Sequence, residues 1–184
     1  WLSNSLGMGV GIDVSQDNLT NENNGACNRV LDKYNSKDKD SLLDNILLVW
    51  GDSGKSFSQN KCAKDVLNQY YLDIVFGNIA ETQISSSRLR KFYNIGNSKG
   101  GYGFDAVSCQ FSLHYFFKNE LTLRTFLENV SYALKVGGKF FGTCLGGQTV
   151  YQRLNENNGT LEGMEKDKLL WKINKLYNKD FDRL

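Results

Sequence analysis

The segment from Phe104 to Leu154 constrains the fold most, because two apolar runs flank a helical pattern. The chain from Phe104 begins as a short apolar run with the length and composition of a buried parallel strand. Apolar residues then recur at helical spacing, at Leu123, Phe126, Leu127, Val130 and Leu134. Lys135-Val-Gly-Gly138 is typical of a helix end, and Lys139–Cys144 has the composition of a second buried strand. This order predicts a β-α-β unit and an α/β fold.

Polar side chains suited to recognition leave the first of these strands. They are Ser108, Gln110, His114 and Tyr115. Ligands of open α/β sheets bind beyond the carboxyl ends of the strands, so a site is expected at Gln110 to Tyr115. His114 is the only histidine, and such a residue is commonly a hydrogen-bonded structural one. The aromatic residues could be core residues, and we assign Tyr115 to the site but Phe116 and Phe117 to packing.

Two further strands of the N-terminal half end in acids. Met8–Asp13 is a β-type run, followed by a helix to about Tyr34 with Ser15 and Asp17 as N-cap candidates. Ile46–Trp50 is a buried strand that leads to Asp52 and Ser53. Such acids are well placed to accept hydrogen bonds from ribose hydroxyls. Alternatively, Asp13 and Asp52 cap the helices that follow them.

The remaining segments carry weaker patterns. Lys61–Tyr71 has helical spacing, and 77–103 is expected to be an insertion loop with one helical turn. Arg88, Arg90 and Lys91 in that loop could contact RNA phosphates or simply be solvated. Gln148–Leu154 is expected to be helical and Asn155–Gly163 a loop, while Lys168–Tyr177 fits either a strand or a helix.

Composition excludes several classes of protein. A chain of 184 residues suits one domain, and its net charge of +2 favours no polyanion partner globally. The four cysteines lack C-x-x-C spacing, so we expect a reduced, intracellular protein with no metal site and no disulfide. No apolar run reaches the length of about 18 residues that spans a membrane, so we expect a soluble chain without membrane contact.

Several segments resemble the mRNA cap guanine-N7 methyltransferases, most closely the type in the capping enzymes of large DNA viruses. The Ser108–Tyr115 segment is the most specific of them. The others are Gly11–Ser15, Asn24–Arg29, Trp50–Ser53 and Gly142–Leu145. The resemblance implies a class I, Rossmann-like methyltransferase sheet that uses S-adenosylmethionine to methylate N7 of the guanine cap of mRNA. It also implies that capped mRNA is the partner and that RNA triphosphatase or guanylyltransferase domains are fused to the protein or associated with it. The implied location is the nucleus for a cellular protein, and the host cytoplasm or the virion for a viral one.

The resemblance also assigns roles to individual residues. Asp13 would bind the ribose hydroxyls, and Asp52 with Ser53 would meet the adenine edge. Gln110 and Tyr115 would close around the methionine end. On the cap side, His114, Tyr115 and Arg29 would contact the guanine and the triphosphate. The resemblance gives no catalytic acid or base, because neutral guanine N7 carries its own lone pair for attack on a sulfonium methyl.

The family's glycine-rich first motif is not found in the sequence. We therefore expect residues 1–184 to form a partial methyltransferase domain whose first and last strands are missing. The expected gap lies between the strands that end at Asp13 and Ser108, and the fragment alone would be inactive. Two alternatives stay open: a class I methyltransferase of another substrate, and a non-catalytic scaffold or RNA-binding subunit.

Overall fold

The structure is a computed structural model that describes residues 7–32, 44–97 and 99–177. The chain divides into two compact units, the first ending at Gly142 and the second beginning at Thr143. All of the expected site residues belong to the first unit, which is described first.

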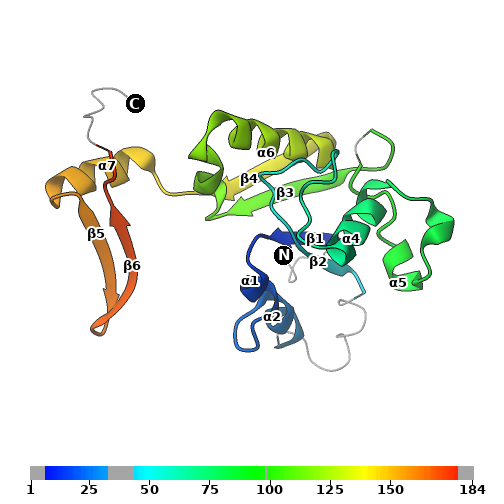
Figure 1. The fold of residues 1–184 in the computed structure, drawn as a ribbon, viewed down its shortest axis with the longest axis horizontal. Coiled ribbons are helices and arrows are strands. Elements are labelled where there is room, and N and C mark those ends of the chain that lie inside the picture. Colours follow the sequence, from blue (N-terminus) through cyan, green and yellow to red (C-terminus); the bar gives the residue numbers. More distant parts are fainter. Residues whose placement is uncertain (1–6, 33–43, 98, 178–184) are drawn as a thin grey trace. The chain divides into compact units, whose positions relative to one another are not determined.

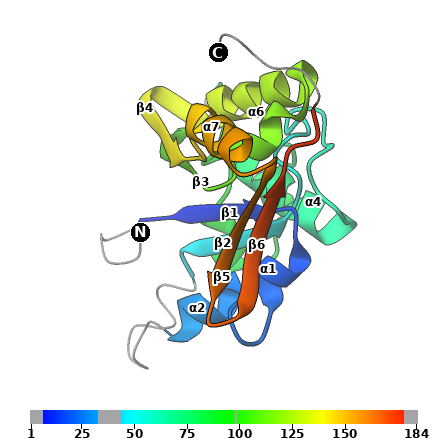
Figure 2. The ribbon, with the colours of Figure 1, turned by 90° about the vertical axis from the view of Figure 1, so that its left-hand side faces the viewer.

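Two parallel strands open the first unit. β1 (Gly9–Asp13) pairs with β2 (Ile46–Trp50), with Gly9 opposite Ile46 and Asp13 opposite Trp50. The two strands lie side by side in both views (Figure 1 and Figure 2). Because they run in the same direction, Asp13 and the loop that follows Trp50 lie at the same edge. Both strands are confirmed where the apolar runs predict them.

A second pair of strands forms the predicted β-α-β unit. β3 (Phe104–Gln110) and β4 (Leu134–Thr143) make a sheet, and α6 (Glu120–Ala133) connects them. A Cβ added to Gly138 would meet the Phe104 carbonyl, and one added to Gly142 would meet the Cys109 carbonyl. The strands therefore run in the same direction, as a helical crossover requires.

The second strand of this unit differs from the prediction. It begins at Leu134, so Lys135–Gly138 is strand rather than helix end, although Gly137 does take a left-handed φ of 81°. It is also largely exposed rather than buried, with Phe140 at 37% and Phe141 at 44%. The reason is that, among the described residues, β3 alone pairs with β4.

The sheet of the first unit is interrupted. β1 pairs with β2 and β3 pairs with β4, and within the described part of the chain no strand joins the two pairs. The fold is thus α/β with two separate strand pairs in this unit, and the expected missing strand between the strands ending at Asp13 and Ser108 stays a prediction.

Helices α1 (Gln16–Thr20) and α2 (Ala26–Asp32) replace the single helix expected after β1. Ser15 is the N-cap of α1, with its hydroxyl accepting the Asn18 N–H at 3.3 Å. α4 (Val66–Phe76) begins five residues later than predicted, since the Asp65 carboxylate accepts the Asn68 N–H at 2.7 Å and caps it. Hydrogen bonds from Asn68 accordingly lower the pKa of Asp65.

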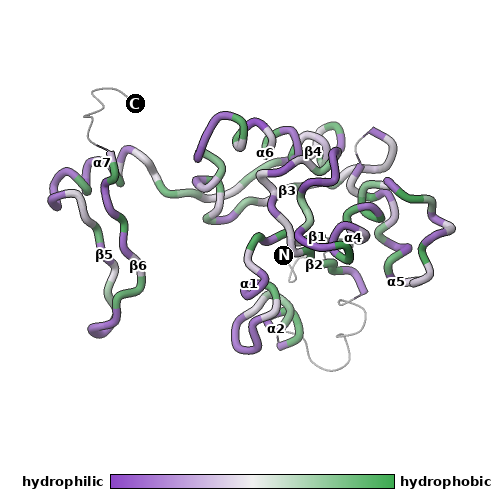
Figure 3. Tube along the Cα trace, in the orientation of Figure 1, coloured by the Kyte–Doolittle hydropathy of each residue, from purple (hydrophilic) through white to green (hydrophobic). Residues whose placement is uncertain are grey.

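The main core lies between β2, α4 and the segment 77–103 (Figure 3). That segment contains η2 (Glu81–Gln83) and α5 (Ser87–Arg90). Its side chains Ile84 and Phe92 are completely buried in the core, which the polar composition of the segment did not suggest. Other buried members are Leu47, Val49, Phe57, Cys62, Leu72, Ile74, Val75, Phe76 and Ala133.

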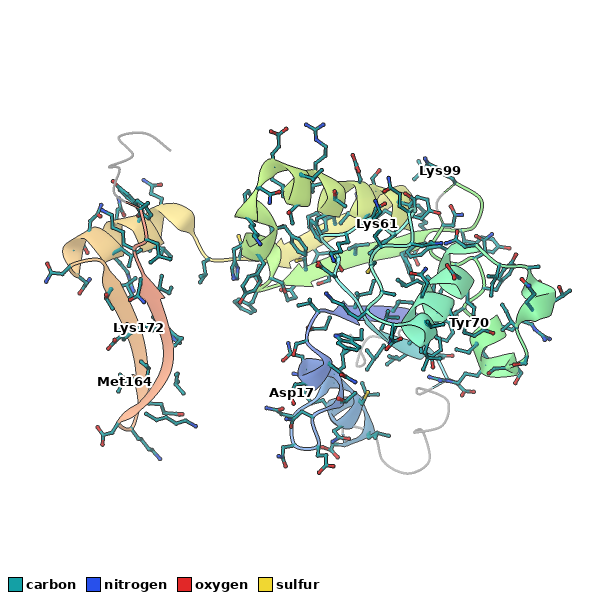
Figure 4. The ribbon with its side chains drawn as sticks, in the orientation of Figure 1. Asp17, Lys61, Tyr70, Lys99, Met164 and Lys172 are labelled. Atoms are coloured by element: carbon teal, nitrogen blue, oxygen red, sulfur yellow. The ribbon has the colours of Figure 1, made fainter. Side chains whose placement is uncertain are left out.

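The second unit is a helix followed by a hairpin. α7 (Gly147–Glu156) agrees with the predicted helix, but β5 (Thr160–Glu165) replaces much of the predicted loop. β6 (Lys168–Asn174) pairs with it in antiparallel fashion, so the ambiguous segment is a strand over those residues. Lys166 and Asp167 both have positive φ, as a tight two-residue hairpin turn requires. Figure 4 marks Met164 and Lys172 on this hairpin.

None of the described helices is both long and apolar enough to cross a membrane.

Candidate functional site

Asp13 ends β1 with its carboxylate folded into a local turn. Its Oδ1 accepts the Ser15 N–H at 2.8 Å, and the Asn18 amide donates to both carboxylate oxygens at 3.3 and 3.2 Å. A carboxylate offers about four acceptor positions, so Asp13 keeps acceptor capacity for a ligand.

Asp52, which follows β2, forms the same kind of turn. Its Oδ1 accepts the Gly54 N–H at 3.0 Å, and Oδ2 lies 4.0 Å from Nζ of Lys64. The alternative that Asp13 and Asp52 are N-caps is wrong, because Ser15 and Asp65 occupy those positions. Each carboxylate instead accepts the backbone N–H two residues further on and so holds the turn at the end of its strand.

Pairing between β1 and β2 brings the two exits together. The Gly51 N–H donates to the Asp13 carbonyl at 2.9 Å. The Trp50 indole N–H donates to the Val14 carbonyl at 3.0 Å. These two hydrogen bonds therefore hold Asp13, at the end of β1, beside the turn that follows β2.

The exit of β3 turns sharply at Phe111. This residue has φ of 52°, a left-handed conformation that costs a non-glycine residue about 1 kcal/mol or more. The Ser112 hydroxyl donates to the Gln110 carbonyl at 2.8 Å and closes the turn. The exposed Gln110 amide donates to the Ser108 hydroxyl, also at 2.8 Å. Nothing in the sequence signalled the conformation of Phe111.

The following 3-10 helix η3 (Leu113–Lys118) carries the two expected cap-side residues. Nδ1 of His114 is buried and has no hydrogen-bond partner among the described residues, so the contacts of this atom do not support the alternative of a hydrogen-bonded structural residue. The Tyr115 ring is 71% exposed, and its centroid is 4.3 Å from that of His114. Phe116 packs inward as predicted, but Phe117 is 63% exposed, which contradicts its assignment to packing.

The turn after β2 contacts η3. A Cβ placed on Gly54 would lie 3.0 Å from Cγ2 of Thr122 and 3.5 Å from Cδ1 of Phe116. Gly54 is thus a close-approach glycine, and it joins the turn of Asp52 to the segment with His114 and Tyr115. This close approach places the turn that follows Asp52 beside η3, the helix that carries His114 and Tyr115.

Arg29 remains apart from these contacts. It is exposed in the last turn of α2, and its side chain makes no hydrogen bond or ion pair within the described residues. Its expected role at the cap triphosphate therefore stays a prediction.

The basic residues of 77–103 have structural partners. The Arg88 guanidinium donates to the Ile46 carbonyl at 2.8 Å and pairs with Asp44, and Lys91 reaches Asp44 at 3.1 Å. The Arg90 guanidinium donates to the Ile84 carbonyl at 2.7 Å. These contacts support a role in fastening α5 to the start of β2, rather than the RNA contact considered above.

Residues that could hold a metal ion do not gather in the structure. No group of three or more His, Cys, Asp or Glu side chains forms in the described ranges. The four cysteines are not joined in disulfides, and Cys144 is exposed, not buried as its predicted strand implied. Burial raises the pKa of Cys62 to about 12, so this thiol is protonated at neutral pH.

Sequence reasoning missed Asn129 of α6. It lies three residues after Phe126, on the face that also carries Val130 and Ala133, and it is 4% exposed. An amide at a core-facing position of an amphipathic helix is the signal that could have identified it.

The two pairs of strands, with acids and polar side chains at their exits, are consistent with a class I, S-adenosylmethionine-dependent methyltransferase fold. Residues 10–167 match a family model described as the mRNA (guanine-N(7))-methyltransferase domain. The chain belongs to this family.

Three similar proteins carry the name mRNA cap guanine-N(7) methyltransferase, and the name of the rice protein adds the number 1. The chain is 42% identical to the Neosartorya fischeri protein over 59 residues, which are 32% of this chain and 9% of that protein. It is 39% identical to the Lodderomyces elongisporus protein over 79 residues, or 43% and 13% of the two chains. The Oryza sativa protein is 45% identical over 56 residues, or 30% and 15%.

The matched segments thus cover far less than two thirds of these relatives. The relatives come from fungi and a plant, so they lend no support to the large-DNA-virus type expected above.

Proposed function

We propose that the intact protein transfers a methyl group from S-adenosylmethionine to N7 of the guanine cap of mRNA. The observation that carries this proposal is the close approach of Gly54 to Phe116, because a Cβ added to Gly54 would lie 3.5 Å from Cδ1 of Phe116. The turn of Asp52 therefore lies beside the segment of His114 and Tyr115. The family membership and the names of the relatives support the same reaction.

The donor side of the site would lie at the exits of β1 and β2. Asp13 has acceptor capacity for ribose hydroxyls, and Oδ2 of Asp52 has no partner closer than Lys64 at 4.0 Å among the described residues, so it can accept from the adenine edge. Gln110 and Tyr115 would orient the methionine end and exclude water from it. S-adenosylmethionine, when bound, supplies the methyl group.

The cap side would lie on η3. The exposed ring of Tyr115 can stack on a purine, which contributes about 1–3 kcal/mol. The imidazole of His114, whose centroid lies 4.3 Å from that of Tyr115, would contact the same guanine. Guanine N7 is a nucleophile without deprotonation, so the site needs alignment and a dry, preorganised environment rather than a base.

The test is methyl transfer to GpppG by the intact protein and by variants. We expect Asp13→Ala and Tyr115→Ala to abolish or strongly reduce the reaction, while Tyr115→Phe retains stacking and most activity. Phe117→Ala is the matched control, since Phe117 lies on the same helix and is 63% exposed, against 71% for Tyr115. The proposal is wrong if the intact protein binds S-adenosylmethionine but methylates no capped substrate, or if both alanine variants stay fully active.

A further inference from the structure

Asn129 of α6 anchors the turn that follows Asp52. The Phe57 N–H donates to its Oδ1 at 2.9 Å. Its Nδ2 donates to the Ser53 carbonyl at 2.9 Å and to the Lys55 carbonyl at 2.7 Å. These partners fix the amide orientation, because a backbone N–H can only donate and a carbonyl can only accept.

The anchor is buried and spans a long stretch of sequence. Asn129 is 4% exposed, and no other polar residue in the described ranges is buried to that degree. Its hydrogen-bond partners lie 72 to 76 positions before it in the chain. A buried, fully satisfied amide of this kind holds its partners in one geometry, since losing any bond leaves a desolvated group unpaired.

The hydrogen bonds that Asn129 donates reach the turn that carries Asp52. Ser53 and Lys55 lie on either side of Gly54, whose N–H donates to the Asp52 carboxylate at 3.0 Å. The Lys55 N–H also donates to the Asp52 carbonyl at 2.9 Å. Moving Ser53 and Lys55 away from α6 would therefore move the Asp52 carboxylate.

We propose that Asn129 is a positioning residue for the adenosine end of the methyl donor, acting through the turn Asp52–Phe57. This inference rests on the proposed function, which assigns Asp52 to that end. Asn129 touches no substrate itself, and it should affect donor affinity while leaving cap affinity unchanged.

Asn129→Asp tests the proposal in the intact protein. One oxygen still accepts from Phe57, but the other faces the carbonyls of Ser53 and Lys55 without a proton to donate. We expect the dissociation constant for S-adenosylmethionine at about pH 8 to rise about tenfold or more, which corresponds to one or two lost hydrogen bonds. Protonation of the new carboxyl group restores a donor, so affinity should recover in part toward about pH 6.

Asn97→Asp is the matched control. The Asn97 amide donates to the Phe76 carbonyl at 3.0 Å and accepts from the backbone N–H groups of Lys99 and Gly100. Lys99 is labelled in Figure 4. This change should lower the melting temperature but leave donor affinity within about twofold and without the pH-dependent recovery.

If Asn129→Asp binds S-adenosylmethionine as tightly as the wild type does, the positioning role is wrong but the proposed function still stands. Equal losses of donor and cap affinity overturn the positioning role as well, because they indicate general destabilisation. If wild-type protein does not bind S-adenosylmethionine, the proposed function fails and this inference with it. Should Asn129→Asp not fold, hydrogen exchange of the wild-type Phe57 N–H decides: it should slow on adding S-adenosylhomocysteine, and an unchanged rate counts against the proposal.

Discussion

The rings of Phe116 and Phe126 stack with their centroids 3.9 Å apart and their planes 12° apart. Phe126 is 5% exposed on α6, while Phe116 belongs to η3. This pair fastens the segment that carries His114 and Tyr115 to the helix that also carries Asn129. Both loops of the candidate site therefore depend on α6.

Replacing Phe126 by alanine should destabilise the protein strongly. The loss of a buried aromatic side chain costs about 3–5 kcal/mol of unfolding free energy, measurable by urea denaturation. Phe117→Ala removes an equally large but 63% exposed ring and should stay within about 0.5 kcal/mol of wild type. Similar losses in both variants would contradict the packing described for η3.

Gly54→Ala should weaken donor binding by displacing the turn of Asp52. The new Cβ would lie 3.0 Å from Cγ2 of Thr122, closer than ordinary contact. Thr122→Ser removes that methyl group but keeps the hydroxyl that contacts the Asn119 side chain at 2.9 Å. We expect the double variant to regain S-adenosylmethionine affinity in titration calorimetry, and failure of this rescue would mean that steric pressure from Thr122 is not the cause.

Arg88→Ala should lower stability without affecting RNA binding. The guanidinium donates to the Ile46 carbonyl and pairs with Asp44, which ties α5 to the start of β2. Since the side chain is 42% exposed, we expect a loss of about 1 kcal/mol in denaturant unfolding. Affinity for a capped oligoribonucleotide should equal that of wild type, and a marked loss would restore the RNA-contact hypothesis.

Cys62 should make stability fall at alkaline pH. Burial raises the pKa of its thiol from 9.0 to about 12, so between these values the unfolded chain loses the proton while the folded chain keeps it. The contribution of this group is fully present below about pH 9 and is lost as pH rises toward 12. Cys62→Ala removes this dependence, so the stability difference between wild type and variant should shrink from pH 8 to pH 10. A constant difference would show that the thiol does not titrate in this way.

Local patterns located much of the first unit. Apolar runs placed β1, β2 and β3, and helical spacing placed α6. The start of α4 was predicted too early, because Asp65 is the N-cap and the apolar spacing from Ala63 did not reveal it. Val66, the first residue of α4, is 87% exposed although it belongs to that apolar spacing. The hairpin of β5 and β6 was missed because its turn, Lys166-Asp167, lacks the glycine that usually marks one.

The candidate site was only partly accessible to sequence reasoning. Residues at strand exits could be found because topology alone puts them at one edge. The Asn129 anchor and the Gly54 contact could not, since each joins segments more than 60 residues apart through individual side chains. Such pairings leave no periodic trace in the sequence.

The interruption between the two strand pairs has a practical consequence. Backbone N–H and C=O groups along an unpaired strand act as a template for strands of neighbouring molecules. Preparations of the 184-residue chain are therefore expected to self-associate as concentration rises, and light scattering over a dilution series would reveal this. Handling at low concentration should keep the chain monodisperse.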